Sequence, residues 1–225
     1  MYFDAHLHLI DENELTKAHN QKINGFILNA TQENEWEKII HLSKKHPFCY
    51  ASIGIHPWFI DSVESGWEQR MDLFLKNNPF LMIGEIGLDG TKKKKEKQTE
   101  IFLKSLILAK KYQRPVHIHA VKSWNEILFH IKNFQNLTFL FHRFKGSNEI
   151  VQELKKYDVW YSLNSTKTID YLPKNKILTE TDCSSSIYPV KKLTELVDNF
   201  FISKVDLEQN FNNFIKKIRS PQNDK

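Results

Sequence analysis

The chain has 225 residues, and its hydrophobic content of 40%, with sixteen Phe and five Trp, suffices for a folded core and excludes wholesale disorder. The net charge of +5 is compatible with an anionic partner such as nucleic acid, but lysines spread along the chain beside many Asn and Ile favour a coding bias as its cause. Two distant cysteines, Cys49 and Cys183, exclude a disulfide framework and a CxxC zinc site.

Eight short β-rich runs recur along the chain, with helical patterns between most of them. Apolar residues spaced i, i+3, i+4 and i+7 predict helices over 34–46 and 96–113, and residues 206–218 begin with a capping Asp206 and predict a closing helix. This alternation is typical of an α/β fold and predicts a slightly shortened (β/α)8 TIM-type barrel. The connection between strands seven and eight is too short for a full helix, so we expect a loop or one turn there. The predicted strands are 2–9, 25–30, 49–57, 80–89, 114–120, 137–144, 159–164 and 176–182.

The organisation of the chain predicts one domain over residues 1–225, because no internal repeat or linker-like tract divides it. Neither a signal peptide nor an apolar run long enough to cross a bilayer is visible. We therefore expect a cytoplasmic protein with no membrane association and no stable protein partner.

The first predicted strand, "YFDAHLHL", has two chemically different faces. Neighbouring side chains of a strand point to opposite sides, so one face is apolar and suited to packing, and it comprises Phe3, Ala5, Leu7 and Leu9. The opposite face carries groups that bind protons or metal ions: Asp4, His6 and His8.

Imidazoles and carboxylates recur at the carboxyl ends of the other predicted strands. Active sites of parallel barrels lie at this end, so these side chains are expected to meet. A lone buried histidine is more often a hydrogen-bonded core residue than a ligand, but six such groups at matching strand ends favour a metal site. The residues concerned, with His56 at the end of strand three, are His6, His8, Glu85, His119, His142 and Asp182.

The ordered set of motifs resembles the TatD-related deoxyribonuclease family of metal-dependent hydrolases. The matching stretches run from Phe3 to about Phe214 and are "FDAHLHL", "GIHPWFI", "IGEIGLD", "RPVHIHA", "FHRFKGS", "TETD" and "EQNFNNF". The resemblance implies a TIM-like barrel that carries two divalent metal ions and hydrolyses phosphodiester bonds, with DNA as the usual substrate. A hydrolase with the same metals acting on a small-molecule ester or amide, or a catalytically silent nucleic-acid-binding module, is the alternative.

The resemblance also implies a ligand set. His6, His8 and Asp182 would hold one metal ion, Glu85 would bridge both ions, and His119 with His142 would hold the second. Imidazoles together with carboxylates suit Zn, Mn or Mg ions. As catalytic residues we expect Glu85 and Asp182, the latter acting both as ligand and as general base for the attacking water.

Several neighbours of the expected ligands have open roles. His117 shares a strand face with His119 but lies one layer further from the strand end, so we favour His119 as the ligand and His117 as a supporting or core imidazole. The acids of the same faces are either satisfied within the structure or orient a ligand. These acids are Asp4, Asp89 and Glu180.

Substrate contacts are less specified than ligands. The resemblance assigns His56 to the substrate phosphate, with a hydrogen bond to its own loop as the alternative, and Lys122 and Arg143 are candidate phosphate contacts. The run "TKKKKEK", which contains Lys92–Lys97, is either a solvated surface or a rim that attracts phosphate. Trp58 and Trp124 could stack on bases, although packing is the more common use. The sequence departs from the family pattern at three positions: Gly90, Val121 and the residue after "ETD", which is not Pro.

Overall fold

The computed structural model describes residues 1–8 and 11–219 and contains one parallel eight-stranded sheet in which strand order follows chain order. Each strand pairs with the next, from β1 through β8, as the (β/α)8 prediction requires. Leu9, which we predicted on the apolar face of the first strand, lies outside the described residues. The strands are β1 (Tyr2–Leu7), β2 (Ile23–Asn29), β3 (Cys49–Ile53), β4 (Met82–Asp89), β5 (Val116–Val121), β6 (Thr138–Phe141), β7 (Asp158–Leu163) and β8 (Ile177–Thr179).

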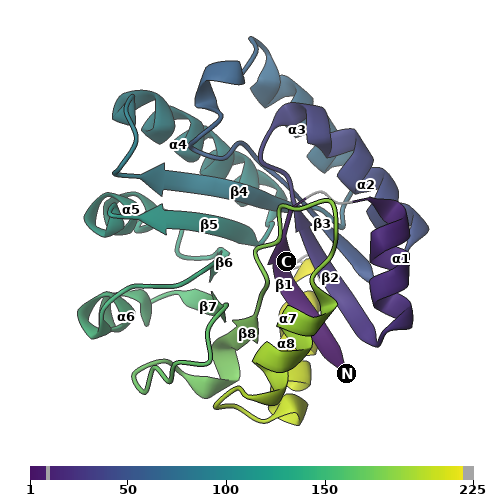
Figure 1. The fold of residues 1–225 in the computed structure, drawn as a ribbon. Coiled ribbons are helices and arrows are strands. Elements are labelled where there is room, and N and C mark those ends of the chain that lie inside the picture. Colours follow the sequence, from purple (N-terminus) through teal and green to yellow (C-terminus); the bar gives the residue numbers. More distant parts are fainter. Residues whose placement is uncertain (9–10, 220–225) are drawn as a thin grey trace.

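The helices surround the sheet as an outer layer (Figure 1). Apolar residues of both the strands and the helices are buried between the two layers, which is the usual location of the main core in this fold. The α-helices are α1 (Glu12–Asn20), α2 (Trp36–Lys45), α3 (Trp67–Asn77), α4 (Lys95–Tyr112), α5 (Trp124–Ile131), α6 (Asn148–Leu154), α7 (Val190–Asp198) and α8 (Lys204–Arg219), and short 3-10 turns occupy Glu33–Glu35, Ile60–Ser62 and Lys174–Lys176.

The predicted shortening of the last crossover is confirmed, since within the described residues β7 and β8 are joined by a loop and the single 3-10 turn Lys174–Lys176. Two details differ from the prediction. Helix α7 follows β8 where we had assigned no helix, and α8 begins two residues before Asp206. Ser203 is the capping residue instead, because its hydroxyl accepts the backbone N–H of Asp206 and donates to the Asp206 carboxylate.

Helix α8 covers the amino-terminal end of the barrel, behind the strands in the view of Figure 1. Its apolar residues Phe211, Phe214, Ile215 and Ile218 form a separate buried cluster with the inward-facing side chains of the lower strands. Those inward-facing residues are Ala5, Ile27, Met82, Leu140, Trp160 and Leu178. The interior is therefore filled at this end, and only the carboxyl end of the barrel is left for chemistry.

The barrel closes between β8 and β1 through backbone bonds beyond the end of β8. The Asp182 N–H donates to the His6 carbonyl at 2.9 Å, and the His8 N–H donates to the Cys183 carbonyl at 2.8 Å. These bonds join the first and last predicted ligand-bearing segments side by side, so residues 176 positions apart in sequence share one edge of the mouth.

Several strands end earlier than predicted, and the departures lie at the functional end. Strand three was predicted to residue 57 but stops at Ile53, strand six to 144 but stops at Phe141, and strand eight to 182 but stops at Thr179. Arg143 and Asp182 have positive φ angles of 42° and 52°, which a strand cannot accommodate. His8, His56, His142 and Asp182 consequently lie just past their strands rather than inside them.

A bulge in β4 sets the direction of Glu85. The β4–β5 register shifts between Ile83 and Ile86, so Gly84 and Glu85 occupy space that regular pairing would give to one residue. Gly87 makes the close approach possible: its φ is 150°, and a Cβ atom there would lie 2.0 Å from the His119 carbonyl oxygen. The glycines of "GEIGLD" therefore bring the Glu85 and His119 backbones together.

An ion-pair cluster at the opposite end should make stability depend on acid pH. Asp158 at the start of β7 accepts from Lys176 at 2.7 Å, Lys217 at 2.9 Å and the Thr138 hydroxyl at 2.8 Å. Burial alone would raise the pKa of Asp158, but these partners outweigh it and lower that pKa from 3.8 to about 2.

The stabilisation that Asp158 contributes is thus present above about pH 4 and is lost as pH falls toward 2. The unfolded chain binds the proton more readily than the folded protein does, so protonation favours unfolding. Asp158→Asn should cost about 1–2 kcal/mol at pH 7 and flatten the dependence of unfolding free energy on pH in that window. Urea unfolding at pH 7, 4 and 2.5 measures this, with exposed Glu37→Gln as control. Equal slopes for wild type and Asp158→Asn would contradict the assignment.

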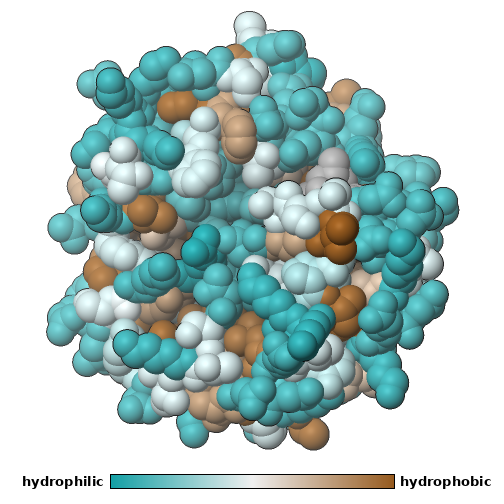
Figure 2. Space-filling view, in the orientation of Figure 1, coloured by the Kyte–Doolittle hydropathy of each residue, from teal (hydrophilic) through white to brown (hydrophobic). Residues whose placement is uncertain are grey.

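The outer surface shows no broad apolar face in this view. Figure 2 presents a mostly hydrophilic face on which apolar side chains form small, separate patches. Across residues 1–8 and 11–219, none of the helices is long and apolar enough to traverse a lipid bilayer.

Candidate metal centre

Glu85 lies at the centre of the candidate site, buried at the carboxyl end of the barrel with 1% of its surface exposed. Its two carboxylate oxygens face different groups of imidazoles. Oε2 lies 3.2 Å from His6 Nε2 and 3.7 Å from His8 Nε2. Oε1 lies 2.8 Å from His119 Nδ1 and 2.7 Å from His142 Nε2. One carboxylate therefore lies between two groups of imidazoles.

Asp182 completes the first cluster. Its Oδ1 lies 3.3 Å from His8 Nε2 and 3.9 Å from His6 Nε2, while its Oδ2 accepts a 2.8 Å hydrogen bond from Arg143 Nη1. The structure thus brings together all six side chains that the sequence nominated as ligands. Groups whose donor atoms lie within 4.8 Å of one another, close enough for one ion, are His6–His142–Asp182, His6–His8–Glu85 and His56–Glu85–His119.

His56 lies closer to the candidate ligands than the sequence interpretation suggested. Its Nε2 is 3.2 Å from Glu85 Oε1 and 3.1 Å from His119 Nδ1, and its Nδ1 accepts the backbone N–H of Trp58. The alternative of a hydrogen bond to its own loop is thus also present. Although β3 ends three residues earlier, the His56 N–H bonds to the Thr31 carbonyl, which holds the ring over the mouth.

The buried charges of this cluster depend on one another. Burial opposes the charged form of Glu85, but the imidazoles of His142, His56 and His6 keep its pKa well below the ordinary value. Burial also disfavours a charged His142, yet Glu85 overrides this and raises the pKa of His142 to about 9. Burial and His142 lower the pKa of His6 to about 3. Two carboxylates, Glu85 and Asp182, lie among these imidazoles, and such an environment stabilises cations.

Unsatisfied polar atoms support the same conclusion. His6 Nε2, Glu85 Oε2, His119 Nε2 and His142 Nδ1 are buried and have no hydrogen-bond partner within the described part of the chain. Buried polar atoms without partners are rare and destabilising unless something binds them. Imidazole nitrogens and carboxylate oxygens are ligands that Zn and Mn ions accept. The residues present therefore fit divalent metal ions.

Buried acids next to the cluster have definite partners. Asp89 Oδ2 lies 3.5 Å from His119 Nε2 and accepts from the indole of Trp58 at 2.7 Å. Glu180 accepts the Arg143 backbone N–H at 2.6 Å, and its Oε1 lies 3.9 Å from His142 Nδ1. Burial raises the pKa of Glu180 to about 7.

Asp4 acts on the site through the backbone rather than through an imidazole. Its carboxylate accepts from the Thr181 N–H and hydroxyl, the Tyr188 hydroxyl and the His6 N–H, at 2.6–3.2 Å. These bonds tie β1 to the segment after β8. Asp4 therefore maintains the barrel closure on which the spacing of His6 and Asp182 depends.

His117 lies in the layer beneath the cluster, as expected from its position two residues before His119. Its ring stacks on His6 at a centroid distance of 5.8 Å, and both of its nitrogens are buried without a hydrogen-bond partner in the described residues. Burial keeps its pKa well below the ordinary value. Within the described residues, no carboxylate lies within ion-pair distance of His117, whereas His119 approaches both Glu85 and Asp89.

The predicted substrate contacts are only partly brought to the mouth. Arg143 lines the central cavity of about 470 Å³, together with His56, Trp58 and the candidate ligands His8, Glu85, His119, His142 and Asp182. Lys122 is exposed and is not among the residues that line this cavity.

The basic run divides into residues with different surroundings. Lys95–Lys97 belong to α4 rather than to a loop, and Lys94 and Lys97 pair with Asp61. Lys92 lies over Trp58, a residue that lines the cavity, with its Nζ 4.3 Å from the centroid of the ring.

Trp58 and Trp124 differ in their exposure. Trp58 is 56% exposed, although its ring also packs edge-on against His56 and His119 at centroid distances of 5.3 and 6.4 Å. Trp124 does pack, against Phe141 and Phe144.

Some residues of the site gave no signal in the sequence. The Asn29 carbonyl lies 3.2 Å from His8 Nδ1 and so orients that ring. Thr31, Gln32, Glu35 and Ser184 line the cavity. Asn29 lies near the end of a predicted strand and the other four follow predicted strands, but polar residues at strand ends are too common for this position alone to identify them.

Comparisons with known proteins agree with the geometry. A human protein named deoxyribonuclease TATDN3 is 25% identical over 234 residues, covering 89% of this chain and 84% of its own. A Methanocaldococcus jannaschii protein described as an uncharacterized metal-dependent hydrolase is 29% identical over 211 residues, covering 84% and 81%. The crystal structure of the TatD homologue YjjV from Escherichia coli K12 has the same fold, with a TM-score of 0.81, 20% identity and coverage of 96% and 97%. The family described as TatD related DNase matches residues 3–192, and the chain therefore belongs to this family.

Proposed function

We propose that this protein is a metal-dependent phosphodiesterase that hydrolyses DNA with two divalent ions, Zn, Mn or Mg. The observation that carries the proposal is the division of Glu85, whose two oxygens face separate groups of imidazoles at 2.7–3.7 Å. A single carboxylate with this arrangement suits a pair of ions a few ångströms apart. Relatives named deoxyribonuclease and metal-dependent hydrolase support the reaction class.

In the proposed mechanism, His6, His8 and Asp182 would hold one ion, His119 and His142 would hold the other, and Glu85 would be shared between them. Bound divalent ions supply Lewis-acid activation of water and stabilise charge on the phosphoryl group. Residues around this centre position the reactants.

The roles of the other polar side chains follow from their placement. Asp182 takes the proton of the attacking water, and Arg143 positions its carboxylate through a 2.8 Å hydrogen bond to Oδ2. His56 and Arg143, both lining the cavity, contact the substrate phosphate. Asp89 orients the His119 ring, and Glu180 fixes the Arg143 backbone beside His142.

Asp182→Asn tests the proton-transfer role. The amide keeps the shape of the side chain but cannot accept a proton, so kcat should fall by about 100-fold or more. Metal content by mass spectrometry and kcat on bis(p-nitrophenyl) phosphate are measured together. Full activity with full metal occupancy would remove Asp182 from the mechanism.

Metal removal and restoration test the proposed function itself. Protein dialysed against EDTA should lose hydrolysis of single-stranded DNA and of bis(p-nitrophenyl) phosphate, and Mn, Zn or Mg should restore both. Turnover confined to small carboxylic esters or amides would favour the small-molecule alternative. DNA binding without turnover under any metal would favour the silent module.

A further inference from the structure

A second cavity of about 530 Å³ lies beside the metal centre, between the loops that follow β6 and β7. Arg143 lines both this cavity and the central one, and its guanidinium contacts Asp182. A group bound in the second cavity would therefore be separated from the candidate metal ligand Asp182 by the Arg143 side chain. The volume lies within the range of about 300–1,000 Å³ that is usual for small-ligand sites.

The second cavity has an excess of positive charge. Arg143, Lys145 and Lys167 line it with a single acid, Asp170. Both lysines are exposed, and within residues 1–8 and 11–219 no carboxylate lies within ion-pair distance of either. Many other surface lysines of this chain do have carboxylate partners, such as Lys94 with Asp61. Unpaired cations next to a phosphodiesterase centre are suited to bind backbone phosphates.

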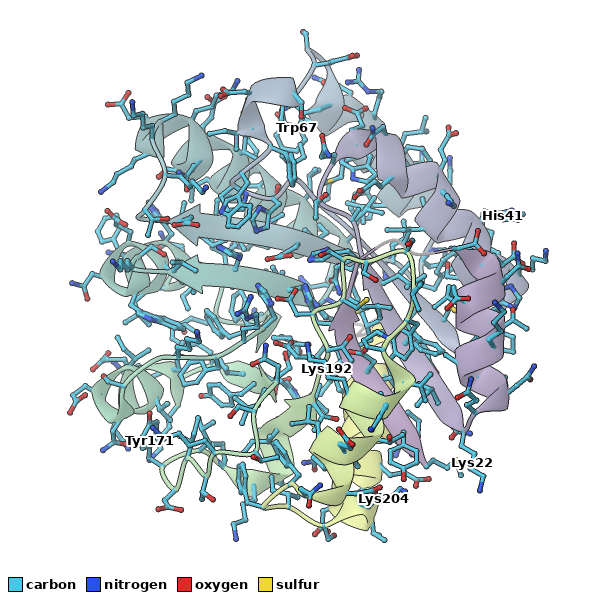
Figure 3. All side chains as sticks on the ribbon, viewed as in Figure 1. Lys22, His41, Trp67, Tyr171, Lys192 and Lys204 are labelled. Atoms are coloured by element: carbon cyan, nitrogen blue, oxygen red, sulfur yellow. The ribbon has the colours of Figure 1, made fainter. Side chains whose placement is uncertain are left out.

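An exposed aromatic ring completes the cavity. Tyr171 is 39% exposed on the loop that follows β7 (Figure 3), and its hydroxyl donates a 2.9 Å hydrogen bond to the Gly146 carbonyl. This bond joins the two loops across the cavity and fixes the ring at its wall. An immobilised and accessible aromatic face is the usual platform for stacking an unpaired base.

We propose that this second cavity binds the nucleotide next to the scissile phosphate of a single-stranded DNA, with the base on Tyr171 and the backbone phosphate on Lys145 and Lys167. The inference rests on the proposed function and narrows it to a polynucleotide with an unpaired flanking base. Arg143 then marks the boundary between the reacting phosphate and its neighbour.

The first experiment measures binding apart from catalysis. Fluorescence anisotropy of a 5′-labelled single-stranded 12-mer is followed with the full-length protein in EDTA. Tyr171→Ala should weaken binding about 5- to 20-fold, while Tyr171→Phe, which keeps the ring but loses the hydrogen bond to Gly146, should weaken it by less. Each of Lys145→Ala and Lys167→Ala should lower the slope of log affinity against log salt by about 0.7. Phe129→Ala and Lys38→Ala, an exposed aromatic and an exposed lysine outside both cavities, are the matched controls.

The second experiment compares substrates with the Mn-loaded protein. The ratio of kcat/KM on the 12-mer to kcat/KM on bis(p-nitrophenyl) phosphate should fall about 10-fold in Tyr171→Ala, because only the 12-mer has a flanking base. A ratio equal to that of wild type overturns the subsite, as does competition by a blunt duplex as strong as by the single strand. Absence of turnover of both substrates by wild type overturns the proposed function instead, and the anisotropy result still decides the subsite.

Discussion

Replacing Glu85 by Gln is expected to lower kcat/KM on a phosphodiester by about 10³-fold or more and to reduce the bound metal. Each Glu85 oxygen faces imidazole nitrogens at 2.7–3.7 Å, so the change removes the one buried charge shared by both clusters. The amide also presents N–H groups, which repel a cation, to one of them. A factor of 10³ corresponds to about 4 kcal/mol of transition-state stabilisation.

Metal analysis and steady-state kinetics on the same preparations check this expectation. Glu153→Gln, on the exposed face of α6, is the matched control and should retain both metal and activity. Thermal unfolding in EDTA separates folding from metal binding. Without metal, any change in Tm of Glu85→Gln reports the loss of the anion that lies among the neighbouring imidazoles. Normal metal content with normal kinetics would show that Glu85 does not bridge two ions.

Gly87→Ala is expected to destabilise the fold by about 4 kcal/mol or more. The added methyl group would lie 2.0 Å from the His119 carbonyl oxygen and 2.9 Å from the His119 N, and backbone atoms cannot yield as a flexible side chain does. For a chain of this length, such a loss lowers Tm by about 10 °C or more. The same strain would separate β4 from β5 and displace His119 from Glu85.

Gly66→Ala provides the control for backbone conformation. Gly66 also has a positive φ, 82°, but its Cβ would meet only the end of the Arg70 side chain, at 3.0 Å. We expect a cost of about 1 kcal/mol there, from the left-handed conformation alone. Calorimetry of both variants measures the difference. Equal and small Tm shifts would mean that β4 can move away from β5 without loss of the fold.

The ligand cluster could be predicted because it depends on periodicity and strand ends. Alternation in "YFDAHLHL" places His6 and His8 on one face, and parallel strands in a barrel bring their carboxyl ends together. Both rules are local, and the eight-stranded sheet confirms the fold that they imply. The prediction that Glu85 and Asp182 lie near each other followed from the order of the strands around a closed barrel.

Features set by irregular backbone could not be predicted in the same way. The bulge at Gly84 and Glu85 interrupts the alternation on which the assignment of faces relied. His56 lies three residues past β3, where no periodicity fixes its direction, and its approach to Glu85 depends on the packing of Gly54 against the Gly84 backbone. The exposure of Trp58 depends on the geometry of the loop after β3, which the sequence pattern does not predict.

Helix α8 has a consequence for the order in which this protein is completed during translation. All six candidate ligands precede Lys204 in the chain, whereas the residues that seal the lower interior, such as Phe214, are made afterwards. In a nascent chain that ends before α8, side chains such as Met82 and Trp160 would lack the apolar partners that α8 supplies. The candidate metal ligands are therefore synthesised before the helix that completes the apolar core beneath them.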